Sequence, residues 1–451
     1  MKHILMIGAG KSATAAISYF LSHAKTNKWQ LTLADYDTKV AALKLQNSPY
    51  GIAKSIDVTN AASRRKLIAK ADLVVSMMPP AFHLPIIKDC IALKKDFINA
   101  SYATPEIKAL AAEAKKAGIR ILCEMGLDPG IDHLSAMKTI HELQTKGAKI
   151  TAFRSYCGGL VAPISDNNPW HYKFSWNPRN VILAGQGTAQ YREGGLTRYI
   201  PYNRLFTQTA PIQIEGYAPM EAYANRDSLS YIALYGLTDA ATFLRGTLRV
   251  EGFCKAWDAL VQIGLTDDSY TISNSATLTY KEWVKSYFNS GAVQANPHMP
   301  IINVIAGYLA GSKKKHEIIP MLESIGLFSD EVIGLNNATP AQILQQLLEK
   351  AWQMQAHDKD MIVMQHQFEY SYRKKNYRLN STLVLEGEDQ VHTAMAKTVG
   401  LALAIGARLL LQRKIKEKGV LLPLTSEIYT PVLSELEKYG IHFKEKITPQ
   451  A

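Results

Sequence analysis

The sequence predicts an α/β protein in which a Rossmann-like doubly wound parallel sheet is joined to a second, mixed α/β domain and a small helical subdomain. Six short apolar runs alternate with helix-like segments over residues 2–125, as in doubly wound sheets. A glycine-rich turn, GAGKSA, links the first run to the first helical segment. After about residue 150, aromatic and glycine-rich segments replace this alternation, and helical periodicity returns over residues 255–355.

The predicted strands are apolar runs, and the predicted helices between them have apolar residues at helical spacing. In chain order the strands are residues 2–9, 29–35, 51–58, 72–78, 96–101 and 119–125. The helices between them are residues 11–24, 62–70, 80–95 and 104–118, and another follows the sequence GLDPGIDH. Near the end of the chain, residues 368–387 alternate like the two strands of a hairpin, and residues 391–412 and 427–443 are helical.

Composition narrows the class of protein. With 47% hydrophobic and 20% charged residues, the chain is expected to be soluble and globular, and we find no apolar run or signal peptide that predicts a membrane or secreted protein. Four cysteines without CxxC spacing favour neither a zinc site nor a disulfide framework, so we expect a cytoplasmic protein with no bound metal. The net charge of +12 is spread out, which argues against nucleic acid and suits an acidic substrate and a phosphate-bearing cofactor.

The turn after the first strand has the GxGxxA pattern of dinucleotide-binding sites. The first glycine permits a tight turn, the second lets a pyrophosphate approach the backbone, and the small third residue lets helix and strand pack. A glycine turn without a ligand is the alternative, but the position between strand and helix favours a cofactor site. The predicted contacts are Gly8, Gly10, Lys11, Ser12 and Ala13.

Asp35 ends the second predicted strand and bears on the choice of cofactor. A carboxylate at this position hydrogen-bonds the ribose hydroxyls and repels a 2′-phosphate, which predicts NAD over NADP. Lys39 stands nearby and keeps NADP possible, and a turn-forming aspartate is the alternative interpretation. Ligands of such sheets bind beyond the carboxyl ends of the strands, so the further cofactor candidates are Asp57, Met77, Met78 and Asn99.

The stretch GLDPGIDH places two acids and a histidine at a strand-to-helix corner. One interpretation is helix capping, with Asp128 as the N-cap and Pro129 in the first turn. The other is a ligand site, because Ser101, Tyr102 and Asp128 each follow a strand at the same edge of the predicted sheet. His133 is expected to pack or to form hydrogen bonds rather than to act as a base.

Three residues of the second domain carry candidate chemistry. Cys157 closes a strand and is either an acid–base group or a buried, inert thiol. Arg226 and Arg249 are either clamps for carboxylates, which guanidinium groups bind bidentately, or partners in surface salt bridges.

Together, the motifs GLDPGIDHLSAMKTI, SYCGGL, NNPWHYKFSW, NRDS, RGTLR, TLVLEG and MAKTVGLALAIGA resemble the L-glutamate-forming saccharopine dehydrogenase family, also called saccharopine reductase, over nearly the whole chain. The resemblance implies a homodimeric oxidoreductase of lysine metabolism that acts on the CH–NH group of saccharopine. Its reversible reaction gives L-glutamate and 2-aminoadipate 6-semialdehyde. Hydride transfer to the nicotinamide cofactor would form an imine, to which water adds before the C–N bond breaks.

The resemblance also implies domain boundaries and site residues. Residues 1–128, completed by C-terminal helices over 393–451, would form the Rossmann-like domain; residues 129–254 and 356–392 the substrate and dimerisation domain; and residues 255–355 the helical subdomain. Asp128 and Cys157 would lie at the reacting centre. The implied substrate contacts are Ser101, Tyr102, Asp128, Arg226, Thr247, Leu248 and Arg249.

Two departures and two alternatives accompany the resemblance. Lys11 and Ser12 stand where relatives often carry apolar or aromatic residues, and GGLVAPIS lacks the usual proline and glutamate of GGLPAPE, which bears on specificity. A carboxynorspermidine-type polyamine dehydrogenase is one alternative, but its positively charged substrate would favour acids over arginines in the pocket. A non-catalytic, NAD-binding redox sensor is the other, and it would not need Arg226, Arg249 and Tyr102 together.

Overall fold

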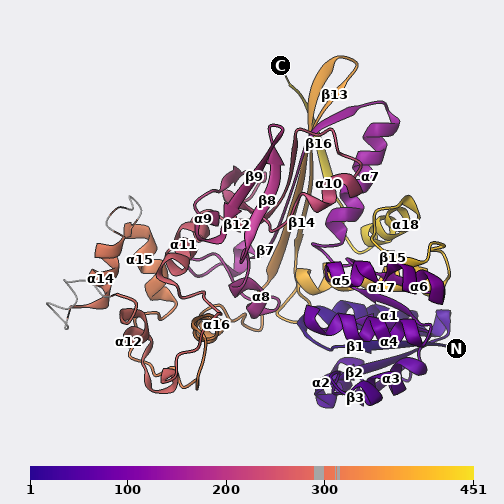
Figure 1. The fold of residues 1–451 in the computed structure, drawn as a ribbon, viewed down its shortest axis with the longest axis horizontal. Helices are drawn as coiled ribbons and strands as arrows, with labels where there is room; N and C mark the ends of the chain where they lie inside the picture. Colours follow the sequence, from indigo (N-terminus) through magenta and orange to yellow (C-terminus); the bar gives the residue numbers. More distant parts are fainter. Residues whose placement is uncertain (289–298, 310, 312–314, 451) are drawn as a thin grey trace. The chain divides into compact units, whose positions relative to one another are not determined.

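The computed structural model describes residues 1–288, 299–309, 311 and 315–450 (Figure 1). The chain divides into two compact units, which are described one at a time. Unit 1 consists of Met1–Cys157, Tyr231–Ala240 and Asp360–Ala451, and unit 2 consists of Gly158–Ser230 and Ala241–Lys359. The three-part division expected from the sequence stays a prediction.

A seven-stranded parallel sheet forms the centre of unit 1, in the order β15-β6-β5-β4-β1-β2-β3. Its first six strands confirm the predicted doubly wound sheet: β1 (Lys2–Ile7), β2 (Trp29–Asp35), β3 (Gly51–Ser55), β4 (Leu73–Ser76), β5 (Asp96–Asn99) and β6 (Arg120–Leu122). The seventh, β15 (Gly419–Leu421), was not expected and pairs with β6 from the far end of the chain. The order of strands reverses between β1 and β4, where the carboxyl ends of doubly wound strands form a binding crevice.

Helices cover both faces of this sheet. One face is buried by α3 (Ala61–Ala69), α4 (His83–Ala92), α5 (Pro105–Ala109) and α6 (Ala111–Ala117), whose apolar side chains share one core with the strands. On the other face, α17 (Ala394–Leu411) approaches α1 (Thr14–Asn27) so closely that a Cβ on Gly400 would lie 2.7 Å from the nitrogen of Ala16. The short helix α2 (Thr38–Leu45) was not expected and is capped by the side chain of Asp37.

Helix α17 confirms the helix predicted over residues 391–412. Among the described residues it is the one helix whose length and composition would suffice to cross a membrane, although most of it is buried inside unit 1. Its first turn is held by the buried carboxylate of Asp360, which accepts hydrogen bonds from the backbone nitrogens of Ala394 at 2.6 Å and Met395 at 2.9 Å. It therefore forms part of the core of unit 1.

Unit 1 also contains antiparallel strands. β13 (Asp360–Tyr372) and β14 (Lys375–Glu386) form the predicted hairpin, in register from Met361 opposite Glu386 to Tyr372 opposite Lys375. β7 (Lys149–Val161), which belongs to this unit as far as Cys157, neighbours β13, and β16 (Lys444–Gln450) pairs with β14. The unit also contains α7 (Ile131–Thr145), α18 (Ser426–Glu437), which is shorter than expected, and all but the first residue of α10 (Ser230–Leu234).

Unit 2 combines strands with a helical core. Its strands are β8 (Thr188–Glu193), β9 (Leu196–Pro201), β10 (Ala210–Ile212), β11 (Met220–Ala224) and β12 (Thr242–Val250), with antiparallel pairing of β10 to β11 and of β11 to β12. The helices include α8 (Pro178–Ile182), α9 (Tyr202–Leu205), α11 (Phe253–Ile263), α12 (Tyr280–Lys285), α14 (Ile301–Tyr308), α15 (Lys315–Ser324) and α16 (Pro340–Ala351). Four tryptophans, Trp170, Trp257, Trp283 and Trp352, are fully buried in its core.

Candidate functional site

The glycine-rich turn lies at the carboxyl end of β1, next to the point where the strand order reverses. Gly8 has a φ of +101°, and a Cβ there would lie 3.0 Å from the backbone of Met77, so a larger residue would not fit. Gly10 faces open space, because nothing lies within 4 Å of the position its Cβ would take. Ala13 is fully buried under the turn. The turn thus leaves Gly10 open to a ligand, whereas Gly8 and Ala13 are closely packed.

Asp35 holds this turn in place. One carboxylate oxygen accepts a hydrogen bond of 2.7 Å from the nitrogen of Ala9, and the other accepts one of 3.0 Å from the nitrogen of Asp37. Lys44 supports the same turn by donating to the carbonyl of Gly10 at 2.6 Å. Burial lowers the pKa of Lys44, and the charge of Asp35 opposes that shift. The sequence pattern indicated Asp35 but gave no signal for Lys44.

Asn99 provides a second observation that fits a bound dinucleotide. Its side chain is fully buried at the end of β5, and the nitrogen Nδ2 has no hydrogen-bond partner within the described ranges. Buried amide donors are normally paired, so an unpaired one beside a ligand crevice indicates that the ligand supplies the acceptor. Together with the open space at Gly10, this donor makes the edge of the sheet compatible with the cofactor that the glycine turn predicts.

The other predicted cofactor contacts surround this edge. Met77 follows β4 and donates its backbone nitrogen to the carbonyl of Ile7 at 2.8 Å, whereas Met78 packs partly into the core beneath α3 and α4. Asp57 is exposed, and hydrogen bonds from Thr59 lower its pKa. The side chains of Lys11 and Lys39 are also exposed, and Ser12 is half-buried.

Two predicted substrate residues follow β5. The hydroxyl of Ser101 lies 2.9 Å from Nε2 of His83, a buried histidine at the start of α4 that sequence reasoning missed. Tyr102 is partly exposed, and its hydroxyl donates a hydrogen bond of 3.1 Å to the carboxylate of Asp128. The structure therefore brings Ser101, Tyr102 and Asp128 to the same edge of the sheet as the glycine turn.

The capping interpretation of GLDPGIDH is wrong. Helix α7 begins at Ile131 with Gly130 at the N-cap position, so Asp128 lies outside the helix. Gly130 has a φ of +149°, and a Cβ there would come within 2.1 Å of Gly126, because the chain folds back on itself before the helix starts. The loop that results, which contains a cis Asp128–Pro129 peptide bond, leaves Asp128 half-exposed and paired with Tyr102.

Beneath this loop lies a buried polar group that the sequence did not indicate. Glu124 has a left-handed backbone with a φ of 62°, and its carboxylate accepts hydrogen bonds from the nitrogen of Ala103 at 3.0 Å and the hydroxyl of Tyr231 at 3.1 Å. Nε2 of His133 lies 2.8 Å from the same carboxylate, and its Nδ1 lies 2.6 Å from the hydroxyl of Tyr235. His133 is thus a buried hydrogen-bonding residue, as expected. Glu124 anchors the loop that carries Ser101 and Tyr102.

Cys157 is the last residue of the first segment of unit 1, and the residue is 7% exposed. The predicted arginines belong to unit 2. Arg226 is exposed in the turn after β11 and donates to the carbonyl of Leu183 at 3.4 Å. Arg249, on β12, is 4% exposed and donates to the carbonyl of Leu248 at 3.0 Å.

The guanidinium of Arg249 lies among aromatic rings. Its central carbon is 5.2 Å from the ring centre of Tyr172, 5.9 Å from that of Tyr223 and 5.1 Å from that of Phe253. Thr247 and Leu248, also predicted as substrate contacts, precede it on the same strand, half-buried and buried respectively. Arg249 therefore differs from Arg226 in being packed into the core of unit 2.

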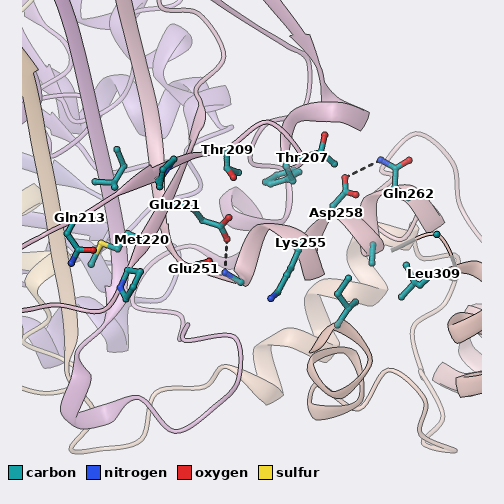
Figure 2. A pocket seen from close by; sticks show the side chains of 18 of the residues that line it. Thr207, Thr209, Gln213, Met220, Glu221, Glu251, Lys255, Asp258, Gln262 and Leu309 are labelled. Atoms are coloured by element: carbon teal, nitrogen blue, oxygen red, sulfur yellow. Dashed lines mark hydrogen bonds between the residues drawn. The ribbon is translucent and has the colours of Figure 1, made fainter. Parts of the chain in front are cut away.

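Unit 2 also has a groove of about 1010 Å³ between β10, β11 and α11 (Figure 2). Glu221 and Asp258 contribute acidic side chains to its wall, Lys255 contributes a basic one, and Gln262 bonds to Asp258. None of the residues predicted for the site lines this groove. In the described part of the chain no group of three or more His, Cys, Asp or Glu side chains is arranged to hold a metal ion.

Comparison with known proteins gives matches along the whole chain. The family described as saccharopine dehydrogenase NADP binding domain matches residues 4–122, and the saccharopine dehydrogenase C-terminal domain matches residues 126–441. The chain is 35% identical to saccharopine dehydrogenase [NADP(+), L-glutamate-forming] of Saccharomyces cerevisiae, over 99% of both chains. It is also 35% identical to an alpha-aminoadipic semialdehyde synthase of Arabidopsis thaliana, of which it spans 44% of the length.

Among solved structures, the fold is similar to that of apo saccharopine dehydrogenase (L-Glu forming) from Saccharomyces cerevisiae. The TM-score is 0.88 at 33% identity, and the match covers 99% of this chain and 100% of the other.

Proposed function

The chain belongs to the saccharopine dehydrogenase family, and on that premise we propose that it catalyses the L-glutamate-forming reaction of saccharopine, in lysine metabolism. The observation that carries the proposal is the Tyr102–Asp128 pair, which lies at the same sheet edge as the open glycine turn. An acid held next to a cofactor edge suits the oxidation of an amine, because positive charge develops on the substrate nitrogen.

When bound, a nicotinamide dinucleotide supplies the hydride acceptor for the carbon that becomes the aldehyde. Gly8, Gly10 and Asn99 would hold it, through the open turn and the unpaired buried amide. Asp128 would stabilise the iminium formed on the substrate and orient the water that adds to its carbon. It would then take a proton from that water and pass it to the nitrogen of the resulting carbinolamine. As the C–N bond breaks, the carboxylate of Asp128 would take the hydroxyl proton of the carbinolamine, so that the aldehyde forms and the nitrogen leaves as the amine of glutamate. Tyr102 would hold the carboxylate of Asp128 in place through its hydroxyl.

The two arginines of unit 2 would bind carboxylates of saccharopine, which has three. The exposed guanidinium of Arg226 is suited to this as it stands. Arg249 would bind a carboxylate through those N–H groups of its guanidinium that the surrounding aromatic rings leave accessible to the substrate. The assignment of Arg226, Thr247, Leu248 and Arg249 as substrate contacts and of Cys157 as a residue near the reacting centre is part of the proposal.

We propose NADP as the preferred cofactor, in place of the NAD expected from Asp35. The names of the Saccharomyces relative and of the matching family domain support this choice. So does the structural role of Asp35, whose two oxygens hold the backbone nitrogens of Ala9 and Asp37. The charge of Lys44 acts on Asp35 as well. Under this proposal, Asp35 positions the glycine turn more than it excludes a 2′-phosphate.

The test is an assay of saccharopine-dependent formation of NADPH and of NADH, with L-glutamate measured as the second product. We expect a higher kcat/KM with NADP than with NAD. Turnover of a polyamine conjugate but not of saccharopine would favour the polyamine dehydrogenase, and cofactor binding without turnover of either would favour the redox sensor. A homodimer and a cytoplasmic location are further proposals, which light scattering and cell fractionation test.

A further inference from the structure

Three side chains form a row from the core of unit 1 to its sheet edge. Oγ of Ser76, the last residue of β4, lies 3.1 Å from Nδ1 of His83, and Nε2 of His83 lies 2.9 Å from Oγ of Ser101. Ser76 and His83 are each 1% exposed, whereas Ser101 is half-buried at the end of the row. The row therefore connects two buried polar groups with a hydroxyl at the candidate site.

Only one of the two ring nitrogens of His83, in the middle of this row, carries a hydrogen. Burial lowers the pKa of His83 to about 4, so the ring is neutral at ordinary pH. A neutral imidazole has one donor nitrogen and one acceptor nitrogen, and its neighbours decide which is which.

The hydroxyl of Ser76 determines which ring nitrogen of His83 is the donor and which is the acceptor. Its buried hydroxyl has no hydrogen-bond partner other than Nδ1 of His83 in the ranges that the structure describes. If Nδ1 carried the hydrogen, the O–H of Ser76 would be buried without an acceptor, which costs stability. Nδ1 therefore accepts from Ser76, and the hydrogen sits on Nε2, which donates to Ser101.

We propose that Ser76 and His83 are positioning residues that direct the hydroxyl of Ser101 to donate its own hydrogen bond to an acceptor oxygen of a bound ligand. Because Oγ of Ser101 already accepts from His83, its hydrogen is left for an acceptor outside the row. The unpaired Nδ2 of Asn99 provides a second donor close by, since Oδ1 of the same side chain lies 3.4 Å from the nitrogen of Ser101.

A hydroxyl that can only donate selects a ligand oxygen with no hydrogen of its own, and the amide donor of Asn99 favours the same kind of atom. A carboxylate of saccharopine and the carboxamide oxygen of the nicotinamide both have this chemistry. The choice between them rests on the proposed function, whereas the direction of the hydrogen bonds does not. Separate measurements of KM for saccharopine and for NADP distinguish the two sources.

The direction of the hydrogen bonds along the row is tested by nitrogen NMR of protein labelled with [15N]histidine. Unprotonated and protonated ring nitrogens give well-separated signals in such spectra. The signals of His83 are assigned by their loss in His83→Gln. We expect hydrogen on Nε2 in the wild type and a mixture of both tautomers in Ser76→Ala. Hydrogen on Nδ1 in the wild type would overturn the proposal. This test requires no substrate, so it decides the matter even if saccharopine is not turned over and the proposed function fails.

The consequence is tested by kinetics. Loss of one oriented hydrogen bond should raise KM for one of the two ligands about 3- to 10-fold in Ser76→Ala, in His83→Phe and in Ser101→Ala, with kcat less affected. His83→Gln, which keeps a donor towards Ser101, should recover part of the loss.

The control is Ser381→Ala, because Ser381 is also 1% exposed but lies on β14. Its KM values should be those of the wild type. The double variant Ser76→Ala/Ser101→Ala should be no worse than Ser101→Ala alone, because Ser76 acts through Ser101. A Ser76→Ala enzyme that matches the control, or effects of Ser76 and Ser101 that add, would contradict the proposal.

Discussion

Several polar side chains of unit 1 and the buried Arg249 of unit 2 contact different kinds of partner. In unit 1, the carboxylates of Asp35 and Glu124 accept hydrogen bonds from the backbone of loops that follow strands, and His83 contacts the hydroxyl at the end of such a loop. In unit 2, the guanidinium of Arg249 is surrounded by three aromatic rings. The first arrangement fixes the shape of a ligand edge, and the second fills a core.

This difference indicates what a substitution should change in each unit. A buried polar group bonded to a loop transmits its loss to the side chains which that loop carries, so kinetic constants change together with stability. A buried cation packed against rings contributes to the stability of its core, so its loss shows first in unfolding. Measuring both quantities for matched variants tests whether the two units differ in this way.

The largest effect is expected for Asp128→Asn in unit 1. The amide keeps the shape of the side chain but removes the negative charge next to the reacting nitrogen. We expect kcat to fall by about 10²- to 10⁴-fold, the usual contribution of an acid–base group. Stopped-flow and steady-state kinetics measure the fall, and an unchanged circular dichroism spectrum and unfolding temperature show that the fold is intact. Near-normal turnover by a folded variant would exclude Asp128 from the chemistry.

The two arginines of unit 2 provide the next test. Arg249→Ala should lower the free energy of unfolding by about 2–5 kcal/mol, because it empties a buried, ring-lined volume. Arg226→Ala, at an exposed position, should change the stability by less than about 0.5 kcal/mol and act on KM for saccharopine alone. Denaturant unfolding and steady-state kinetics measure both quantities. Equal stabilities for the two variants would refute the distinction between a packed and an exposed guanidinium.

In unit 1, Glu124→Gln should have a smaller but mixed effect. The amide nitrogen cannot accept the hydrogen bonds that the carboxylate receives from Ala103 and Tyr231, so one buried donor loses its partner, at a cost of about 1–3 kcal/mol. Because the Ala103 loop carries Tyr102, KM for saccharopine should rise as well. Glu113→Gln is the matched control, since Glu113 is exposed on α6. A loss of stability without any change in KM would show that Glu124 contributes to the stability of the core but does not position the substrate-binding loop.

The parallel sheet could be predicted because its first six strands are short apolar runs between polar turns. The seventh, β15, has three residues and takes its place by pairing with β6 across almost 300 positions of the chain, which no local pattern reveals. The start of α7 was misplaced for a similar reason. Its position depends on the return of the chain from Gly130 to Gly126, and Asp128-Pro129 imitates a capping sequence.

At the candidate site, Gly8, Gly10 and Asp35 could be predicted from their spacing, because one turn and one strand end bring them together. Glu124 and His83 could not, because Ala103 and Ser101, the residues they contact at the site, lie about 20 positions away in a loop whose shape only the fold determines. A lone acid in the apolar run IRILCEM is the one trace of this arrangement in the sequence.

The smallest effect is expected for Cys157→Ser, in the first segment of unit 1. The residue is buried, and serine has nearly the same shape but cannot replace a thiol as an acid–base group. If Cys157 is a packing residue, kcat should change by less than about threefold, the pH–rate profile should keep its shape, and stability should fall by about 1 kcal/mol for the buried hydroxyl. If the pH–rate profile of the variant instead loses its acidic or its basic limb, the thiol is a proton donor or acceptor in the reaction. Unit 1 would then hold a second reacting group beside Asp128. The pH–rate profile of kcat/KM distinguishes the two roles, because a change in packing alone lowers the whole profile without moving its inflections.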